Sequence, residues 1–380
     1  MKKTGSFIVL FITITFIVKS QDIDSITLSK LKLNFAVPDM PAFKTLGTDP
    51  SNLLRPSTVQ AIALNVSSFN DKGKFIIPKA FAMEISPALL LNNKKGLTQL
   101  AEYAKRAVVN SFRISLGTST DSLQTGRNLA LGLRVSLIDK GDPTTDIAFQ
   151  KIIAGKLRLI RKSERAIAAK KDFIKENRKP DDPTDDEAFI NLNLKDYSKF
   201  FQDREDIQKP FQEEIKAEKE KYRKEHWNDD KLDIAIAILS SSPDSLFKNI
   251  KFNKASFWGV YAIKAGKSGQ FIVGLNGQVY KNLSDTVKAT RNKTYTSISI
   301  PMRYLIGTNR VKGFAELQLN YASLENQSTF LMNLGSELNI VDGIWINIFA
   351  GLDYNSVTKT SSFITNLNLK LTLPENFKFF

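Results

Sequence analysis

The chain alternates apolar and polar residues over long runs, most clearly in its last third. In the run 361–373, leucine occupies positions 367, 369, 371 and 373, and Asn366, Asn368 and Lys370 lie between them. Successive side chains of a β-strand point to opposite faces, so this period of two predicts a strand with one apolar and one polar face. A soluble sheet shows the same alternation, so a single run does not separate a soluble protein from a membrane protein.

Comparable runs recur along the chain, and we predict about twelve strands. They cover 58–69, 79–90, 110–118, 128–137, 232–241, 255–264, 269–280, 296–306, 311–323, 329–340, 344–356 and 361–373. Most are ~9–13 residues long, enough to cross a bilayer at a tilt of ~45°, whereas strands of soluble proteins are mostly shorter. The run 232–241 also fits a buried helix, because periodicity does not decide a short apolar segment.

The N-terminus has the features of a secretory signal peptide. Lys2 and Lys3 precede the apolar stretch 7–18, and the residues that follow predict cleavage before Gln21. The stretch is shorter than the ~20 apolar residues of a spanning helix, and no later stretch suits one. We therefore expect a signal peptide at 1–20, an N-terminal periplasmic segment at 21–56, and an outer-membrane barrel domain at 57–380 that contains an insert at 140–230.

Composition narrows the choice of partners. The chain has no cysteine, which excludes disulfides within it and thiolate metal sites, and its formal net charge is +15. A basic protein can bind nucleic acid, but an exported chain without a basic recognition motif favours anionic lipid headgroups or an anionic solute. The alternative is that the charges lie on solvated loops.

The polar faces of the runs carry charged residues. A soluble sandwich would expose these faces, whereas a membrane barrel turns them toward its lumen and turns the leucines toward lipid. Strand length, strand number and the export signal favour the barrel. The residues that we expect to line its lumen are Glu84, Arg134, Arg303, Glu316, Gln318, Glu337, Asn366, Asn368 and Lys370.

The connections differ in length. Short, turn-rich segments lie at 265–269, 307–310 and 341–343, whereas most of the intervening loops are longer. Outer-membrane barrels have short periplasmic turns, and a periplasmic C-terminus places all three short segments on that side. The same count puts the insert in the periplasm. It would be extracellular if 232–241 were a helix.

The insert is predicted to be helical, as is a short segment at 93–108. Apolar spacing indicates a helix over 152–177, Pro180 and Pro183 interrupt it, and a second helix restarts with Pro210 in its first turn. The insert is either a solvated hairpin or a docking element for a periplasmic protein. The candidate partner-binding residues are Lys156, Arg158, Arg161, Lys162, Arg165, Lys170 and Lys171.

The segment "SISIPMRYLIG" at 297–307, followed at once by another alternating run, resembles porin-like outer-membrane β-barrel proteins of the Gram-negative, Bacteroidetes type. The terminal Phe380 fits the same class. The resemblance implies an all-β fold, a transmembrane antiparallel barrel. The usual terminal signal has apolar residues at alternate positions before the last Phe, but Asn376 and Lys378 occupy them here, so we expect 367–373 to make the assembly contact.

Catalytic chemistry has little support. Most barrel enzymes use a histidine, and the one histidine, His226, lies in the helical insert. His226, Asp229 and Asp230 could together form a metal site, but the sequence favours the interpretation that His226 is a solvated side chain at a helix end. We predict no cofactor. The leading hypothesis is a pore or transporter for small solutes. The alternatives are a non-conducting anchor or assembly protein whose insert binds a periplasmic partner, and a membrane-embedded enzyme.

Overall fold

The computed structural model describes residues 31, 33, 39–47, 51–56, 61–65, 80–88, 96–120, 127–242, 250–281, 293–324, 326–341 and 343–372. The predicted signal peptide and the aromatic C-terminus lie outside these residues. The described part is mostly antiparallel β-structure, with helices concentrated between two of the strands.

Every predicted run contains a strand, and most boundaries agree within a few residues. The strands are β1 Ala61–Asn65, β2 Ala80–Ile85, β3 Arg113–Thr120, β4 Arg127–Asp139, β5 Lys231–Ser242, β6 Lys251–Ala265, β7 Gly269–Lys281, β8 Thr294–Gly307, β9 Val311–Ala322, β10 Gln327–Val341, β11 Ile344–Asn355 and β12 Thr360–Thr372. The ambiguous run 232–241 is a strand and not a helix.

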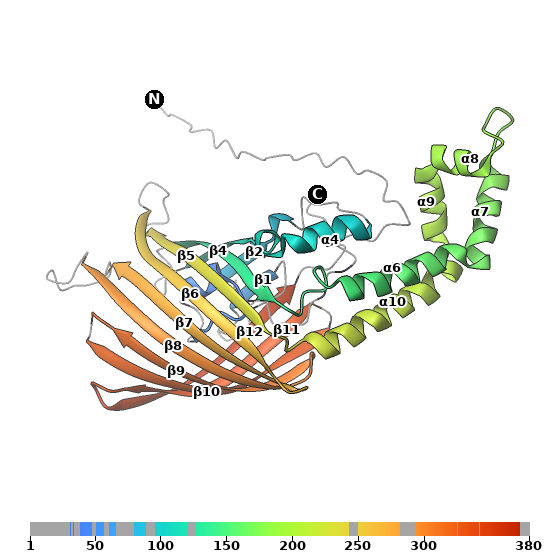
Figure 1. Ribbon diagram of the computed structural model, residues 1–380. Coiled ribbons are helices and arrows are strands. Elements are labelled where there is room, and N and C mark those ends of the chain that lie inside the picture. Colours follow the sequence, from blue (N-terminus) through green and yellow to red (C-terminus); the bar gives the residue numbers. More distant parts are fainter. Residues whose placement is uncertain are drawn as a thin grey trace, which may run out of the picture. The chain divides into compact units, whose positions relative to one another are not determined.

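The strands pair in chain order, each antiparallel to the next, and β1 pairs with both β2 and β12. Leu64 of β1, for example, lies opposite Leu369 of β12 on one side and Phe81 of β2 on the other. The order therefore closes on itself as a barrel, whose tilted strands are visible in Figure 1.

Most large apolar residues of the wall point outward, whereas its inner face is mainly polar and includes a few buried aromatic residues such as Trp258. In β9, Lys312, Glu316 and Gln318 are each 1% exposed, whereas Leu317 and Leu319 are 40% and 49% exposed. A sheet in water would bury the leucines and expose the charges. The alternation predicted from the sequence is thus confirmed, with its polar face inside.

The strand count places the insert at the same end of the barrel as the short turns. Asp139 ends β4 opposite Lys231 of β5, and Lys231 lies opposite Ala262, close to the turn between β6 and β7. The connections β8–β9 and β10–β11 lie at this end as well. We call it the short-turn end.

The helices are α2 Pro41–Thr45, α4 Leu97–Lys105, α5 Ala107–Asn110, α6 Ile147–Lys162, α7 Glu164–Asn177, α8 Asp186–Leu192, α9 Leu194–Asp203 and α10 Glu205–His226. The helix predicted over 152–177 is two helices, because Ser163 caps α7 by accepting a hydrogen bond from the Ala166 amide. Pro210 lies inside α10 and not in its first turn, so that prediction is wrong. The helices α8 and α9 were not predicted.

The chain divides into two compact units. The described part of the first is Leu157–Gln212, which has its own small core of Phe173, Ile174, Phe189 and Ile190. The second contains the barrel, the start of α6 and most of α10. In the second unit Phe149 of α6 packs on Tyr222 of α10, with ring centroids 4.3 Å apart. The start of α6 is therefore in contact with the end of α10.

None of the described helices combines the length and the apolar composition that a membrane-spanning helix requires.

Candidate functional site in the barrel lumen

The residues predicted to line the lumen lie on the inner face of the wall. All but one are no more than 3% exposed, and the exception, Asn366, is partly exposed. The eight buried residues are Glu84, Arg134, Arg303, Glu316, Gln318, Glu337, Asn368 and Lys370. Charges withdrawn from water to this extent need partners, and the source of those partners defines the site.

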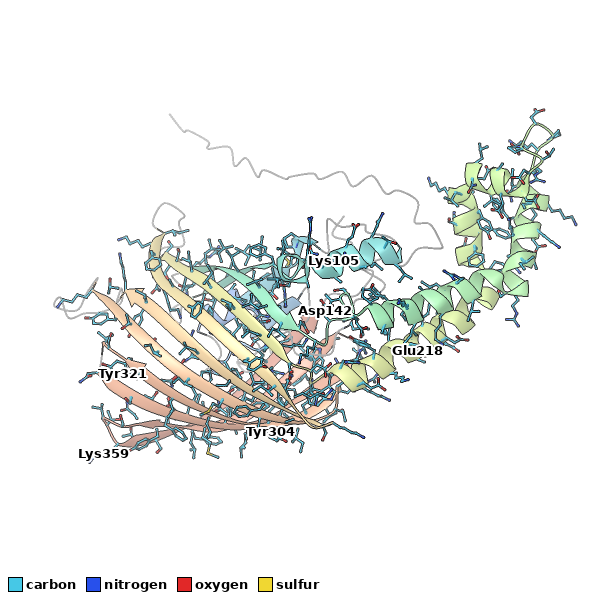
Figure 2. The ribbon with its side chains drawn as sticks, in the orientation of Figure 1. Lys105, Asp142, Glu218, Tyr304, Tyr321 and Lys359 are labelled. Atoms are coloured by element: carbon cyan, nitrogen blue, oxygen red, sulfur yellow. The ribbon has the colours of Figure 1, made fainter. Side chains whose placement is uncertain are left out.

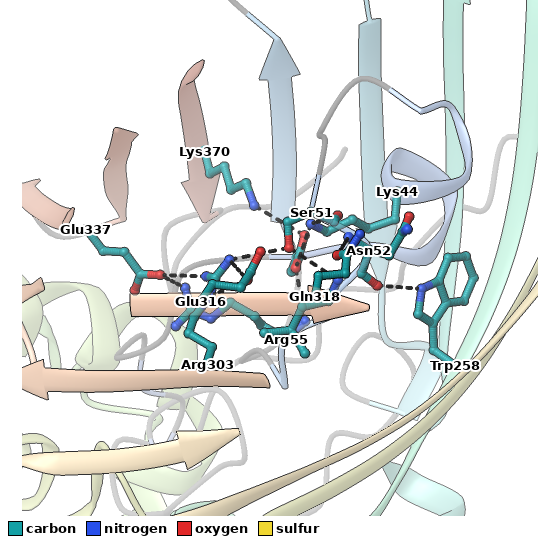
Figure 3. Close-up of polar contacts among 12 residues, drawn as sticks. Lys44, Ser51, Asn52, Arg55, Trp258, Arg303, Glu316, Gln318, Glu337 and Lys370 are labelled. Atoms are coloured by element: carbon teal, nitrogen blue, oxygen red, sulfur yellow. Dashed lines mark hydrogen bonds and ion pairs between the residues drawn. The ribbon is translucent and has the colours of Figure 1, made fainter. Parts of the chain in front are cut away.

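Some of these partners are other wall residues, as where Arg303 pairs with Glu316, and the rest come from the chain's own N-terminal segment. We call its described residues 39–47 and 51–56 the plug. The Ala42 amide donates to Ser115 Oγ of β3 at 3.1 Å, the Asn52 amide donates to Gln318 Oε1 of β9 at 2.7 Å, and Trp258 Nε1 of β6 donates to the Asn52 carbonyl at 3.1 Å. A short segment bonded to strands so widely separated around the closed sheet lies inside the barrel (Figure 3).

Asp39 is the centre of one group of charges. Its carboxylate accepts a hydrogen bond from Lys370 Nζ at 3.2 Å and from the Arg55 amide at 3.0 Å, and it lies 3.8 Å from Lys44 Nζ. The Asp39 carbonyl accepts from Arg134 Nη2 at 2.6 Å. One plug residue therefore joins β12, β4 and the rest of the plug.

Arg55 is the centre of the second group. Its guanidinium forms an ion pair with Glu337 of β10, and Glu337 also lies 3.4 Å from Arg303 Nη1. Arg303 in turn donates from Nε to Glu316 at 2.7 Å and from Nη2 to Ser51 Oγ at 3.5 Å. These contacts, drawn in Figure 3, tie the second half of the plug to β8, β9 and β10.

Apolar side chains of the plug complete two small cores. Met40 and Phe43 pack against Ala82 of β2, and all three are fully buried. Leu53 and Leu54, 0% and 1% exposed, belong to a larger cluster. Its aromatic members are Trp258, Phe314 and Phe349. The plug is therefore packed like the interior of a globular domain.

Gly132 of β4 shows how closely the plug approaches the wall. A Cβ atom added there would lie 2.8 Å from Pro41 Cβ and 2.9 Å from the Ala42 nitrogen. Real side chains do not approach so closely, so only glycine fits beneath α2 at this point. An inward-facing glycine in an otherwise regular strand was the one sequence signal for a segment inside the barrel.

The sequence analysis placed 21–56 outside the barrel as a periplasmic segment. For the described residues 39–47 and 51–56 that placement is wrong, because they lie in the lumen and bond to its wall. The physical reason is that buried charges of the inner face need partners, and Asp39 and Arg55 supply them to Lys370 and Glu337.

The C-terminal end of the insert is fixed in the short-turn end of the barrel. Asn228, fully buried, donates from Nδ2 to the carbonyls of Gly266 and Gly269 at 3.0 and 2.7 Å. Lys312 Nζ lies 5.0 Å from the Trp227 ring and 4.8 Å from the Trp345 ring. Such cation–π contacts are strongest where water is excluded, as it is here.

The N-terminal end of the insert is joined to its C-terminal end. Lys140 Nζ donates to Asp230 Oδ2 at 2.8 Å, and this contact lowers the pKa of the Asp230 carboxyl, helped by the Lys264 amide. His226 Nδ1 lies 2.6 Å from Asp229 Oδ2, and Lys264 Nζ lies 2.5 Å from Asp229 Oδ1. His226 therefore has a hydrogen-bond partner at the helix end, where the sequence analysis expected a solvated side chain.

The basic residues predicted to bind a partner are not equivalent. Lys156 lies 3.4 Å from Glu214 and 3.5 Å from Glu218, and Lys170 pairs with Glu187. Arg158, Arg165 and Lys171 are exposed, whereas the side chains of Arg161 and Lys162 lie outside the described residues. Arg158 and Lys171 are therefore the exposed members that we consider for an acidic partner.

Comparison with known protein families finds no matching family model, and comparison with curated proteins finds no matching sequence. The resemblance to porin-like outer-membrane proteins therefore stays a prediction.

Proposed function

We propose that the chain is an outer-membrane β-barrel that its own N-terminal segment holds closed, and that it anchors the helical insert at the membrane. The observation that carries the proposal is the plug. Two charges that would line a solute path, Lys370 and Glu337, are paired instead with Asp39 and Arg55 of the plug.

The outer face supports the membrane location. It carries a continuous set of exposed large apolar side chains, of which Leu131, Ile300, Leu317, Leu334 and Leu352 are between 40% and 56% exposed. A soluble protein rarely exposes so much apolar surface, whereas lipid favours it. Tyr304 and Tyr321, both more than 40% exposed, lie toward the two ends of the sheet (Figure 2), as aromatic residues do at membrane interfaces.

The packing of the plug favours an anchor over an open pore. A solute pore, the leading hypothesis from the sequence, would require the plug to leave the lumen. Its departure would expose Leu53 and Leu54 and strip partners from Glu337 and Lys370. Separating a buried charge from its partner costs about 3–5 kcal/mol, so the plugged state is the stable one.

The insert supplies the partner-binding part of the anchor. Asn228 donates hydrogen bonds to the carbonyls of Gly266 and Gly269, and Trp227 contacts Lys312, so the C-terminal end of α10 is attached to the barrel wall. Exposed Arg158 and Lys171 suit an acidic periplasmic protein as the partner.

Conductance in planar lipid bilayers tests the proposal. We expect the purified chain to insert without producing channel steps. In the variant Arg55→Glu two carboxylates would face each other at Glu337, the plug would be destabilised, and steps should appear. The matched control, Arg165→Glu on the exposed surface of α7, should stay silent. Regular channel steps from the unmodified chain would contradict the proposal in favour of the pore.

A further inference from the structure

The segment between β2 and β3 exposes apolar side chains outside the barrel wall. It contains α4 and α5, and the strand count puts it at the short-turn end. Val108 and Val109 of α5 are 42% and 73% exposed, and Phe112, which leads into β3, is 38% exposed. Three exposed large apolar residues within five positions of the chain indicate a contact surface.

The segment is held firmly against the wall. Ser111 Oγ donates to the Ser136 carbonyl at 3.0 Å and accepts from the Ser136 amide at 2.9 Å. Asn110 Nδ2 donates to the Tyr103 carbonyl at 2.9 Å, and burial of the Tyr103 ring raises the pKa of its hydroxyl. The exposure of the two valines is therefore a fixed property of the fold.

The exposed residues continue the apolar outer face of the barrel. Phe112 has the same outward phase as Leu116 of β3, which is 46% exposed. On the neighbouring strand β4, Leu137 and Ile138 are 40% and 37% exposed at the same end. The apolar surface thus passes without interruption from the middle of the barrel to α5.

Basic residues adjoin the apolar ones. Lys105 and Arg106, both exposed, end α4 immediately before α5 begins. Apolar residues flanked by Lys or Arg are the composition of segments that lie in a membrane interface, where the apolar groups enter the acyl boundary and the cations meet anionic headgroups.

We propose that residues 105–112 form an interfacial contact with the lipid leaflet at the short-turn end of the barrel. Val108, Val109 and Phe112 lie at the acyl boundary, and Lys105 and Arg106 contact phosphate groups of anionic phospholipids. This inference rests on the proposed membrane location, and it assigns to the segment a partner of defined chemistry, an anionic phospholipid surface.

Single cysteine labels test the inference cleanly, because the chain has no cysteine of its own. An environment-sensitive fluorophore is attached in turn to Val109→Cys, Leu131→Cys and Glu102→Cys, and each protein is reconstituted in bilayers of phosphatidylethanolamine and phosphatidylglycerol. Lipids spin-labelled at shallow or deep acyl positions serve as quenchers. We expect deep quenching at 131, shallow quenching at 109, and quenching by neither lipid at 102, which is exposed on α4.

The outcomes separate the two proposals. Quenching at 131 without quenching at 109 would overturn the interfacial contact and leave the membrane barrel intact. Absence of quenching at 131 would overturn the membrane location itself. Replacing phosphatidylglycerol with phosphatidylcholine, or combining Lys105→Gln with Arg106→Gln, should weaken shallow quenching at 109 and leave quenching at 131 unchanged. Unchanged quenching at 109 would overturn the contact with anionic headgroups.

Discussion

Asp39 determines how the plug is held, because it is the plug carboxylate shared by three cations. Lys370, Lys44 and Arg134 lie around it, and the side chains of Asp39, Lys370 and Lys44 are 1–2% exposed. An isolated charge at such a depth would be strongly unfavourable, so each member of the group is stable because the others are present.

The substitution Asp39→Asn tests this dependence. It keeps the shape of the side chain and removes the negative charge, so Lys370 and Lys44 lose their ion pairs with residue 39. We expect the free energy of unfolding to fall by about 3–5 kcal/mol, measured by urea titration of the folded, heat-modifiable form in detergent.

An exposed aspartate provides the control. Asp196→Asn on α9 should change the free energy of unfolding by no more than about 0.5 kcal/mol. Equal, small effects of the two substitutions would show that the charges around residue 39 are solvated and that the plug is loosely bound.

Single residues of the wall could be predicted, whereas those of the plug could not. Period-two alternation assigns Glu316 and Lys370 to one face because every strand residue obeys the same geometry. The segment containing Asp39 and Arg55 has no period, since α2 is only five residues long and the rest is irregular. Its position follows from charge partners more than 250 residues away in the sequence.

At the junction between α10 and the barrel, the residues that follow the helix are bonded to the strands. Asn228 bridges the turn between β6 and β7, while Trp227 covers Lys312. Burial of Tyr222 further along the helix raises the pKa of its hydroxyl, and its ring packs on Phe149 of α6. The end of the insert nearest the barrel is therefore as ordered as the strands.

The substitution Asn228→Ala should loosen this junction. It removes both hydrogen bonds and leaves the carbonyls of Gly266 and Gly269 without that donor, at a cost of about 1–3 kcal/mol. Hydrogen exchange of the amides at 226–231 and 266–269 should accelerate, and exchange in β10 and β11 should not. An equal rate in the variant and the unmodified chain would show that the two hydrogen bonds contribute little; Asn191→Ala on exposed α8 is the control.

At the scale of elements, strands were predicted better than helices. Each strand repeats the same alternation of apolar and polar residues. The segment 232–241 fits this pattern as well, and it pairs with β4 on one side and β6 on the other. The short helices α8 and α9 follow a proline-rich acidic stretch that looks like a loop, and their core comes from α7, which the local sequence does not reveal.

For the whole molecule, the strand count decides on which side of the membrane the insert lies. With β5 established as a strand, the insert and the short turns belong to the same end. Short turns are periplasmic in outer-membrane barrels, so the proposed location puts the insert in the periplasm.

A protease site tests this topology. A recognition sequence engineered into 179–187, which covers most of the connection between α7 and α8 and the first two residues of α8, should resist protease added to intact cells. It should be cut once the outer membrane is permeabilised. A matched site in the opposite-end connection 282–292 should be cut in both conditions. Cleavage at 179–187 in intact cells would mean that the insert is extracellular.

The contacts of the plug also constrain the order in which parts of the protein can fold. Asp39 is separated from Lys370 by 331 positions, and Arg55 from Glu337 by 282. Contacts of such long sequence separation form slowly, because the intervening chain must be ordered before they become favourable. The plug precedes every strand in the chain, yet its contacts with β10 and β12 form last. Until those strands are in place, Arg55 lacks Glu337 and Asp39 lacks Lys370.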